Sequence, residues 1–359
     1  MNLQVALSTF RGHRTPRMRI IQRRRTWALL SGGVILVSLL GFAVRGINYS
    51  IDFTGGTHLI LENPAGASVG EVRDVLAAEP YDRADAEVQS VGGARISIRT
   101  TSLTDLSADE RTQLIADLAA VGGVTPDEVN QQVVGPTWGG QISRQALIGL
   151  VIVLVAITLY ITVRFEWKMA IGSMVALIHD LVITAGVYAV FGREVAPPTV
   201  IALLTILGFS LYDTVVIYDK VKENTESPAL LAKRTYEEVA NDSMNQVLMR
   251  SVNTSLVVVL PIAALLFFGG ATLKDFALAM LIGVLTGAYS SIFVATPLLV
   301  VLKEREPRMV AQRERLRRES RGRDAVEGGP AAPATPVVVP GEPARPARRK
   351  TSRKQRRRR

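Results

Sequence analysis

Long apolar runs separated by polar stretches dominate the pattern of this chain. A helix needs about 20 mainly apolar residues to cross the hydrocarbon core of a bilayer, and six runs approach or exceed that length with few charges inside them. The predicted helices are 26–44, 146–164, 168–191, 199–219, 251–268 and 275–302. The pattern predicts an α-helical multi-pass membrane protein with six transmembrane helices. The fifth run contains Asn253 and Pro261, so its ends are the least clearly marked.

The first run has a second interpretation, as a cleaved secretory signal peptide. Its apolar stretch is longer than that of a typical signal, and no small-residue cleavage site follows it. Instead, Gly46-Ile47-Asn48-Tyr49 leads directly into a strand-like stretch. We therefore interpret residues 26–44 as a transmembrane helix that is retained.

Residues 45–145, between the first two runs, show the shorter periods of a small α+β domain. Partial alternation of apolar and polar residues predicts strands at 51–61, 87–90, 95–100 and 129–134. Two capping boxes, Ser68-x-x-Glu71 and Ser107-x-x-Glu110, each predict the start of a helix. Gly92-Gly93 is a hairpin signal between the second and third strands. The order β-α-β-β-α-β predicts a ferredoxin-like extracytoplasmic domain.

The basic residues are concentrated at the two ends of the chain, which decides how its net charge of +10 is interpreted. Residues 1–25 contain seven Arg and no acid, and residues 303–359 contain 19 Lys and Arg against 7 Asp and Glu. A basic protein often binds nucleic acid, but basic segments that flank apolar runs fit membrane topology better. Because basic flanks stay in the cytoplasm, we expect both termini there, together with the loop 220–250, and residues 45–145 outside.

The C-terminal segment changes character near Gly322, where Pro, Ala and Gly become frequent before a final run of Arg and Lys. It has too little apolar surface to offset the entropy of ordering the chain, so we expect disorder. Two interpretations stay open: a solvated basic tail, or a tail that contacts anionic lipid or ribosomal RNA. The predicted organisation is a basic N-terminus (1–25), a first helix (26–44), an extracytoplasmic domain (45–145), a five-helix membrane region (146–302) and a basic, largely disordered cytoplasmic tail (303–359).

Ionisable residues inside the apolar runs are the candidates for chemistry, because they are costly in a bilayer and usually functional there. Asp180 follows His179 near the middle of the third run, Asp213 lies inside the fourth, and Arg250 opens the fifth. The fourth and fifth helices run in opposite directions, so Asp213 and Arg250 can meet toward the cytoplasmic side. A carboxylate that exchanges between a proton and a cationic partner meets the physical requirement for a proton relay.

Each of these residues also has a purely structural interpretation. Asp180 can hydrogen-bond between helices, His179 is expected as a packed polar residue, and Asp213 with Arg250 can form a static salt bridge. On the sixth run, small residues recur at every fourth position and predict close helix packing; they are Ala279, Gly283, Gly287 and Ser291.

The sequence lacks the motifs of soluble enzymes. It contains no phosphate-binding Gly-rich loop with Lys, no HExxH and no GxSxG, and no cysteine for disulfides or thiolate sites. An intramembrane aspartyl protease is disfavoured, because such proteases carry Gly-x-Gly-Asp where Ala176-Leu177-Ile178-His179 precedes Asp180 here. We therefore predict no enzymatic activity, no catalytic residue, no metal and no cofactor, with energy supplied by an ion gradient or a partner.

Several motifs occur in a fixed order along nearly the whole chain except its basic ends. They are Gly46–Thr57, with Asp52, Phe53, Gly55 and Gly56 in a G-x-D-F-x-G-G pattern, then Val134-Gly135-Pro136, His179-Asp180, Gly208–Val216, Arg250–Ser255 and Gly287–Phe293. Each motif alone is weakly specific. In this order they resemble the SecF members of the SecD/SecF family, in the resistance-nodulation-division superfamily.

The resemblance implies a subunit of the accessory complex of the Sec translocase in the cytoplasmic membrane, which uses the proton-motive force to drive preprotein export. It implies a SecD partner, contact with SecYEG and SecA, YajC as a further partner, and preproteins as substrates. Asp213 and Arg250 match positions assigned to proton transport, with Asp180, Tyr212 and Asn253 as supporting polar residues. The coupling ion is predicted to be H⁺, with Na⁺ left open.

A proton-coupled exporter of small molecules from the same superfamily is the alternative. Such exporters usually carry both halves in one chain, so a single six-helix half with one small outer domain favours protein export. Two departures from the family pattern are notable. Tyr212 stands where many relatives carry Asn, and the Arg-rich tail is longer than usual, so no family function is assigned to the tail.

Overall fold

The computed structural model describes residues 15–91 and 94–327. The predicted hairpin turn at Gly92-Gly93 and the segment 328–359 lie outside these residues. The chain divides into two compact units, Met1–Arg313 and Glu314–Arg359. The first unit contains the sheets and the membrane helices.

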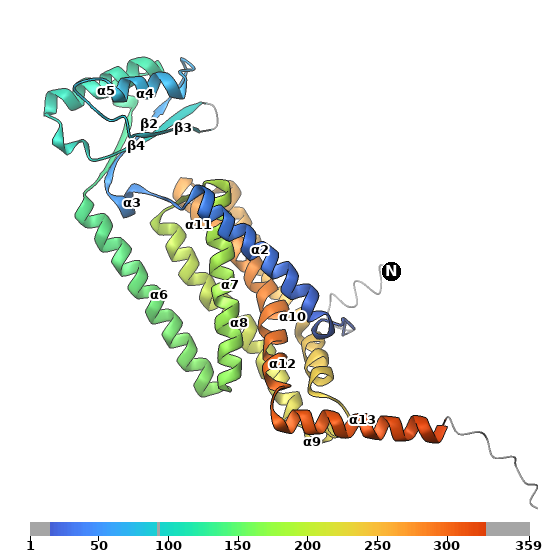
Figure 1. Cartoon of the computed structure of the whole chain (residues 1–359). Coiled ribbons are helices and arrows are strands. Elements are labelled where there is room, and N and C mark those ends of the chain that lie inside the picture. Colours follow the sequence, from blue (N-terminus) through green and yellow to red (C-terminus); the bar gives the residue numbers. More distant parts are fainter. Residues whose placement is uncertain (1–14, 92–93, 328–359) are drawn as a thin grey trace, which may run out of the picture. The chain divides into compact units, whose positions relative to one another are not determined.

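Six helices within the described residues are long and apolar enough to cross a membrane, which confirms the predicted number (Figure 1). They are α2 (Arg24–Arg45), which follows the short 3₁₀ helix η1 (Ile21–Arg23), α6 (Pro136–Arg164), α7 (Trp167–Phe191), α8 (Pro197–Thr225), α10 (Tyr236–Phe268), and a composite of α11 (Ala271–Ser290), η4 (Ser291–Ala295) and α12 (Thr296–Lys303). The segment η4 is a π-helix. Such single turns widen a helix locally and often occur at functional sites.

The observed helices are longer than the apolar runs that predict them. Helix α6 begins at Pro136, not at 146, so the outer domain is shorter than the predicted 45–145. The predicted loop 220–250 is also wrong in its bounds. Helix α8 continues to Thr225, and α10 begins at Tyr236, where Thr235 and Glu238 form a capping box. Hydropathy detects only the apolar part of a helix, whereas capping and packing extend it into polar sequence. Only ten residues, including α9 (Pro228–Leu231), therefore separate α8 from α10.

The outer domain is a four-stranded antiparallel sheet with two main helices. Its elements are β2 (Gly56–Glu62), α4 (Val69–Ala77), β3 (Glu87–Val91), β4 (Arg95–Thr100), η2 (Leu103–Asp105), α5 (Ala108–Gly122), η3 (Pro126–Glu128) and β5 (Asn130–Val134). The strand order is β3-β4-β2-β5, and both predicted capping boxes are present. Helices α4 and α5 cover one face of the sheet (Figure 1), where alternate strand residues and the helices' apolar faces form a buried core. The predicted β-α-β-β-α-β order is confirmed.

The first predicted strand, 51–61, is shorter than expected. Residues Ile51–Thr54 form the short helix α3 instead. Gly55 and Gly56 have φ values of +74° and +128° and turn the chain from α3 into β2. A side chain at Gly56 would also clash with the carbonyl of Thr100, so only glycine fits this turn.

A second, two-stranded sheet joins the chain after α2 to the chain after α7. Strand β1 (Asn48–Tyr49) pairs in parallel with β6 (Glu194–Val195). The residues that precede the outer domain are thereby attached to the connection between two membrane helices.

Small residues allow the membrane helices to approach one another closely. A Cβ on Gly283 would clash with Ile206, and one on Gly287 would lie 3.0 Å from the Cβ of Ser210. Both contacts are with α8, and Ala279 and Ser291 of the same row are buried. The row predicted from the sequence thus faces α8.

Helix α13 (Pro307–Glu327) corrects the prediction for the tail, because the segment 303–359 begins with a helix that extends past Gly322. Arg and Glu are good helix formers, and Arg315 pairs with Glu319 one turn away at 3.4 Å. Charged residues can therefore form most of this helix, while Met309 near its start packs against the apolar core of the membrane helices.

Candidate functional site

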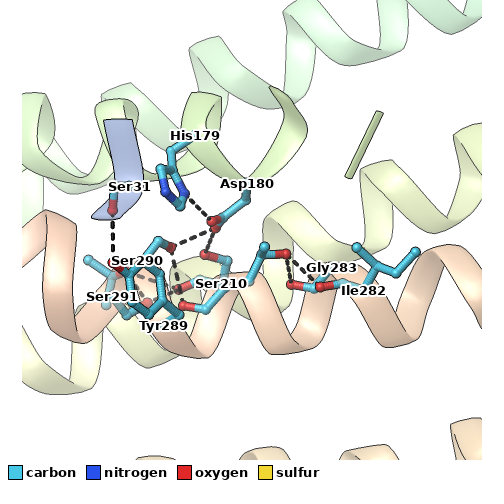
Figure 2. A network of polar contacts seen from close by, with 12 residues as sticks. Ser31, His179, Asp180, Ser210, Ile282, Gly283, Tyr289, Ser290 and Ser291 are labelled. Atoms are coloured by element: carbon cyan, nitrogen blue, oxygen red, sulfur yellow. Dashed lines mark hydrogen bonds and ion pairs between the residues drawn. The ribbon is translucent and has the colours of Figure 1, made fainter. Parts of the chain in front are cut away.

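Asp180 on α7 is the centre of a buried polar network that joins three helices. Its side chain is 1% exposed. Its Oδ2 accepts hydrogen bonds from the hydroxyls of Ser210 on α8, at 2.7 Å, and Ser290 on α11, at 2.8 Å. Its Oδ1 lies 3.1 Å from Nδ1 of His179 (Figure 2). Both carboxylate oxygens are therefore occupied, and the group links α7, α8 and α11.

The network continues from Asp180 to a fourth helix. The ring of Tyr289 stacks on His179 with centroids 5.9 Å apart, and its hydroxyl lies 2.9 Å from Oγ of Ser31 on α2. Ser291, the first residue of η4, bonds to Thr214 at 2.8 Å and donates to the carbonyl of Ser210 at 3.3 Å. The polar network therefore includes Ser290 and Ser291, which lie where the α-helix α11 ends and the π-helix η4 begins (Figure 2).

Asp213 on α8 is also buried, but it lacks comparable partners. The side chain is 5% exposed, and its Oδ2 has no hydrogen-bond partner among the described residues. The hydroxyl of Ser251 on α10 is also buried and lies close enough to act on the Asp213 carboxyl, although neither this hydroxyl nor Oδ2 of Asp213 makes a hydrogen bond of ordinary geometry among the described residues. A buried carboxylate oxygen without a hydrogen bond is costly, and a bound proton or cation would lower that cost.

Asp213 on α8 and Arg250 on α10 lie on helices that pack against each other. Among the described residues, however, they do not form an ion pair within 4.0 Å. Arg250 instead donates from Nη2 to the hydroxyl of Tyr212 at 3.3 Å. Tyr212 is 51% exposed. Arg250 nevertheless lies close enough for its charge to act on the carboxyl of Asp213. The static salt bridge that the sequence left open as the structural alternative is therefore not formed between these described residues. Asn253 lies half-buried one turn further along α10.

In the outer domain, the predicted motif residues have structural contacts. Asp52 accepts from the hydroxyl of Ser50 at 3.1 Å and from Gln132 at 3.5 Å. The ring of Phe53 lies 6.1 Å from that of Tyr49. Together with the two glycines after α3, these contacts shape the passage from the membrane helix into the sheet.

Arg99 on β4 is a residue that sequence reasoning missed. It is 9% exposed and donates to Asn48 at 2.7 Å and to the carbonyl of Tyr49 at 3.2 Å. It also pairs with Glu87 at 3.0 Å and lies 3.8 Å from Glu194. Burial raises the pKa of Glu194, and the Arg99 charge opposes that rise. Arg99 thus links β4 to β1 and β6. In the sequence, the only signal for this role is its position in a strand of alternating polar and apolar residues.

The sequence profile of the family described as "Protein export membrane protein SecD/SecF, C-terminal" matches residues 115–305, and that of the SecD/SecF GG motif matches residues 41–62. The chain belongs to the SecD/SecF family. The protein translocase subunit SecF of Streptomyces coelicolor is 42% identical over 301 residues, which are 82% of this chain and 79% of that protein. The subunit SecF of Mycobacterium tuberculosis is 45% identical over 307 residues, 81% of this chain and 68% of the relative.

A solved SecD/SecF structure supports the same fold. The crystal structure of SecDF, a translocon-associated membrane protein from Thermus thermophilus, matches with a TM-score of 0.69 and 35% identity. The match covers 81% of this chain and 39% of that one. The resemblance seen in the sequence is therefore confirmed, and the chain is a multi-pass membrane protein of protein translocation. Its SecD/SecF relatives include both separate SecF subunits and the longer SecDF chain.

Proposed function

We propose that this chain is the SecF-type half of a Sec accessory complex that uses the proton-motive force to drive preprotein export. The observation that carries the proposal is Asp213, a buried carboxylate with an unpaired oxygen beside an arginine that is bound elsewhere. A group in this state can gain a proton, or gain Arg250, when the helices move. Exchange between those two partners couples proton movement to helix movement.

The complex needs a second half, and we propose a SecD-type chain for it. The SecDF relative of Thermus thermophilus carries both names in one chain, and 280 residues of this chain align with 36% of it. Tyr212 and Arg250 are exposed on the surface of this chain, so membrane helices of a partner can reach them. The wider assembly would include SecYEG, SecA and YajC, with preproteins as substrates.

We further propose a location in the cytoplasmic membrane with both termini on the cytoplasmic side. The charge distribution supports this orientation, because the seven arginines of residues 1–25 precede the first membrane helix. H⁺ is the proposed coupling ion. No nucleotide-binding motif occurs in the sequence, so the complex would take its energy from the gradient and from ATP hydrolysis by a partner.

The test is preprotein export in membrane vesicles that contain the complex with Asp213→Asn. Export driven by an imposed proton gradient should fall to the level measured without the gradient, because the amide cannot bind and release a proton. Asp219→Asn is the matched control, since Asp219 lies on the same helix but is exposed and pairs with Arg164 at 3.2 Å. Gradient-driven export that survives Asp213→Asn, in a variant that still inserts and co-purifies with its partner, would rule out the relay.

A further inference from the structure

A groove with a volume of about 740 Å³ lies between α2, α7 and the η4–α12 segment, and none of its lining residues belongs to α8 or α10. Its walls are almost entirely apolar. On α7 the lining residues follow helical spacing, with Val175, Ile178 and Val182 on one face. The groove is therefore a separate feature from the Asp213 site.

The groove follows the separation of α2 from α7. These helices are in closest contact where Gly186 packs against Ser38, since a Cβ on Gly186 would clash with that serine. From Leu39, beside this contact, the lining residues of α2 continue back to Arg24 and Arg25 in its first turn. At 1.5 Å per residue the groove extends for about 22 Å, more than half of the ~30 Å hydrocarbon core.

The wide end of the groove carries positive charge. Arg25 is exposed and forms no ion pair among the described residues. Its neighbour Arg24 is held by Glu304 at 3.2 Å. The preceding turn is fixed by Asn241, whose Oδ1 accepts from the backbone N–H groups of Ile20 at 2.9 Å and Ile21 at 3.2 Å. The two arginines thus have a defined position at the mouth, and one of them is uncompensated.

The inner wall of the groove carries a buried polar atom without a partner. His179 is 3% exposed and lines the groove, and its Nε2 has no hydrogen-bond partner among the described residues. Its stacking partner Tyr289 bonds to Ser31, so the imidazole lies near the level of Ser31, about 9 Å below Arg25 by helix rise.

The His179–Asp180 pair determines what Nε2 offers. A net charge on a buried pair is costly in a membrane, so the neutral pair is favoured. That pair is either imidazolium with carboxylate or neutral imidazole with carboxylic acid bonded to Nδ1. Nε2 carries a hydrogen in both forms. The groove therefore presents a cation at its mouth and apolar walls beyond, while the Nε2–H donor of His179 lies just beneath the wall, where a small side-chain shift would expose it.

We propose that this groove binds an anionic phospholipid from the surrounding bilayer. The phosphate lies at Arg25 and Arg24, an ester carbonyl accepts from Nε2–H of His179, and an acyl chain lies along the apolar face of α7. The order of cation, donor and apolar wall matches the order of phosphate, ester and chain in the lipid. Another protein's helix would satisfy the apolar walls but offers no anionic head group at the mouth.

The first experiment uses the full chain purified with its partner and exchanged into equal amounts of phosphatidylglycerol and phosphatidylcholine. Lipids retained after delipidation are counted by native mass spectrometry, and the wild type should retain phosphatidylglycerol selectively. Gly32→Leu should abolish retention, because Gly32 lines the groove and a side chain there meets open space. Gly33→Leu is the matched control, since it also meets open space but does not line the groove. Arg25→Gln should lower retention about fivefold.

The second experiment tests the role of His179 with diacyl and dialkyl phosphatidylglycerol, which differ only in the ester carbonyls. The wild type should prefer the diacyl lipid. His179→Phe preserves the ring and should remove that preference while leaving selection of phosphatidylglycerol over phosphatidylcholine.

Three results would overturn the proposal. One is a wild type that retains both head groups equally, and another is equal loss in the Gly32→Leu and Gly33→Leu variants. The third is cross-linking of the Gly32→Cys variant to a helix of the partner. That cysteine would be unique, because the chain contains none.

Discussion

Asp180 and Asp213 are two buried carboxylates on the packed helices α7 and α8, and their surroundings differ sharply. Asp180 has both oxygens occupied by His179, Ser210 and Ser290, with distances from 2.7 to 3.1 Å. Asp213 has an oxygen without a partner among the described residues, and its nearest cation is bound to Tyr212. Burial alone therefore does not distinguish a structural carboxylate from a working one.

We propose that the number of satisfied hydrogen bonds distinguishes a structural carboxylate from one that exchanges protons. A carboxyl group held by three hydrogen-bond partners from three helices resists a change of state, because every bond must break together. A carboxylate with an unpaired oxygen changes partner at little cost. We infer that Asp180 holds the helices and that Asp213 moves protons between them, and the following substitutions test the contrast in order of expected effect.

Replacing the two carboxylates by leucine should lower stability clearly at Asp180 and hardly change it at Asp213. Asp180→Leu removes the acceptor of two serine hydroxyls and of His179, and should cost about 2 kcal/mol of unfolding free energy, given roughly 0.6 to 1.7 kcal/mol per hydrogen bond in membrane proteins. Asp213→Leu loses no bond to Oδ2 and should change stability by less than about 0.5 kcal/mol. Denaturation in mixed micelles measures both, and equal losses would contradict the comparison.

The two serines that bond Asp180 provide a finer test. Ser210→Ala and Ser290→Ala should each lower the unfolding free energy by about 0.6 kcal/mol, and the double variant should lose a different amount from the sum because both share Oδ2. Ser90→Ala in the outer domain is an exposed control that leaves the membrane bundle untouched. Additive losses would show that Asp180 does not couple the helices.

Tyr212→Phe tests whether the hydrogen bond that holds Arg250 away from Asp213 matters for export. Loss of the hydroxyl frees Arg250, and gradient-driven export should slow by about two- to tenfold, the equivalent of one hydrogen bond of 0.5–1.5 kcal/mol. Tyr160→Phe is the control, because Tyr160 on α6 is also 51% exposed. Export rates at a fixed gradient measure the effect. Identical rates in both variants would show that the Tyr212 hydroxyl takes no part in export.

The smallest effect concerns the pH at which these assays are run. His58 in the outer domain lies 2.7 Å from Ser97, and burial followed by the Arg99 charge lowers its pKa below the ordinary value of 6.5. The unfolded chain therefore binds a proton more readily than the folded one, so stability is lost as pH falls below about 6.5. His58→Gln should remove a small part of the acid sensitivity of the outer domain, followed by circular dichroism. Export profiles taken above pH 6.5 are then free of the contribution from His58.

Local patterns predicted much of this architecture. Apolar runs predicted six membrane helices, and the capping boxes at Ser68 and Ser107 marked two helix starts correctly, because a cap is made by residues three positions apart. Predictions failed where neighbours from elsewhere in the chain decide the outcome. Residues 51–54 have strand-like composition, but they form α3, which packs against α6.

The candidate site shows the same difference between what local sequence predicts and what distant contacts decide. The cost of a charge in a bilayer made Asp180, Asp213 and Arg250 visible from the sequence, since ionisable residues stand out in apolar runs. Nothing in their spacing revealed that Arg250 bonds to Tyr212, or that Ser290 turns toward Asp180.

Composition and contacts within a few residues therefore predicted the set of membrane helices, the order of the elements in the outer domain and the residues able to carry charge. Tertiary structure alone decided which carboxylate is satisfied and where a groove opens between α2 and α7. Those outcomes depend on how helices far apart in the chain pack, and a difference of about 1 Å between facing side chains makes or removes a hydrogen bond.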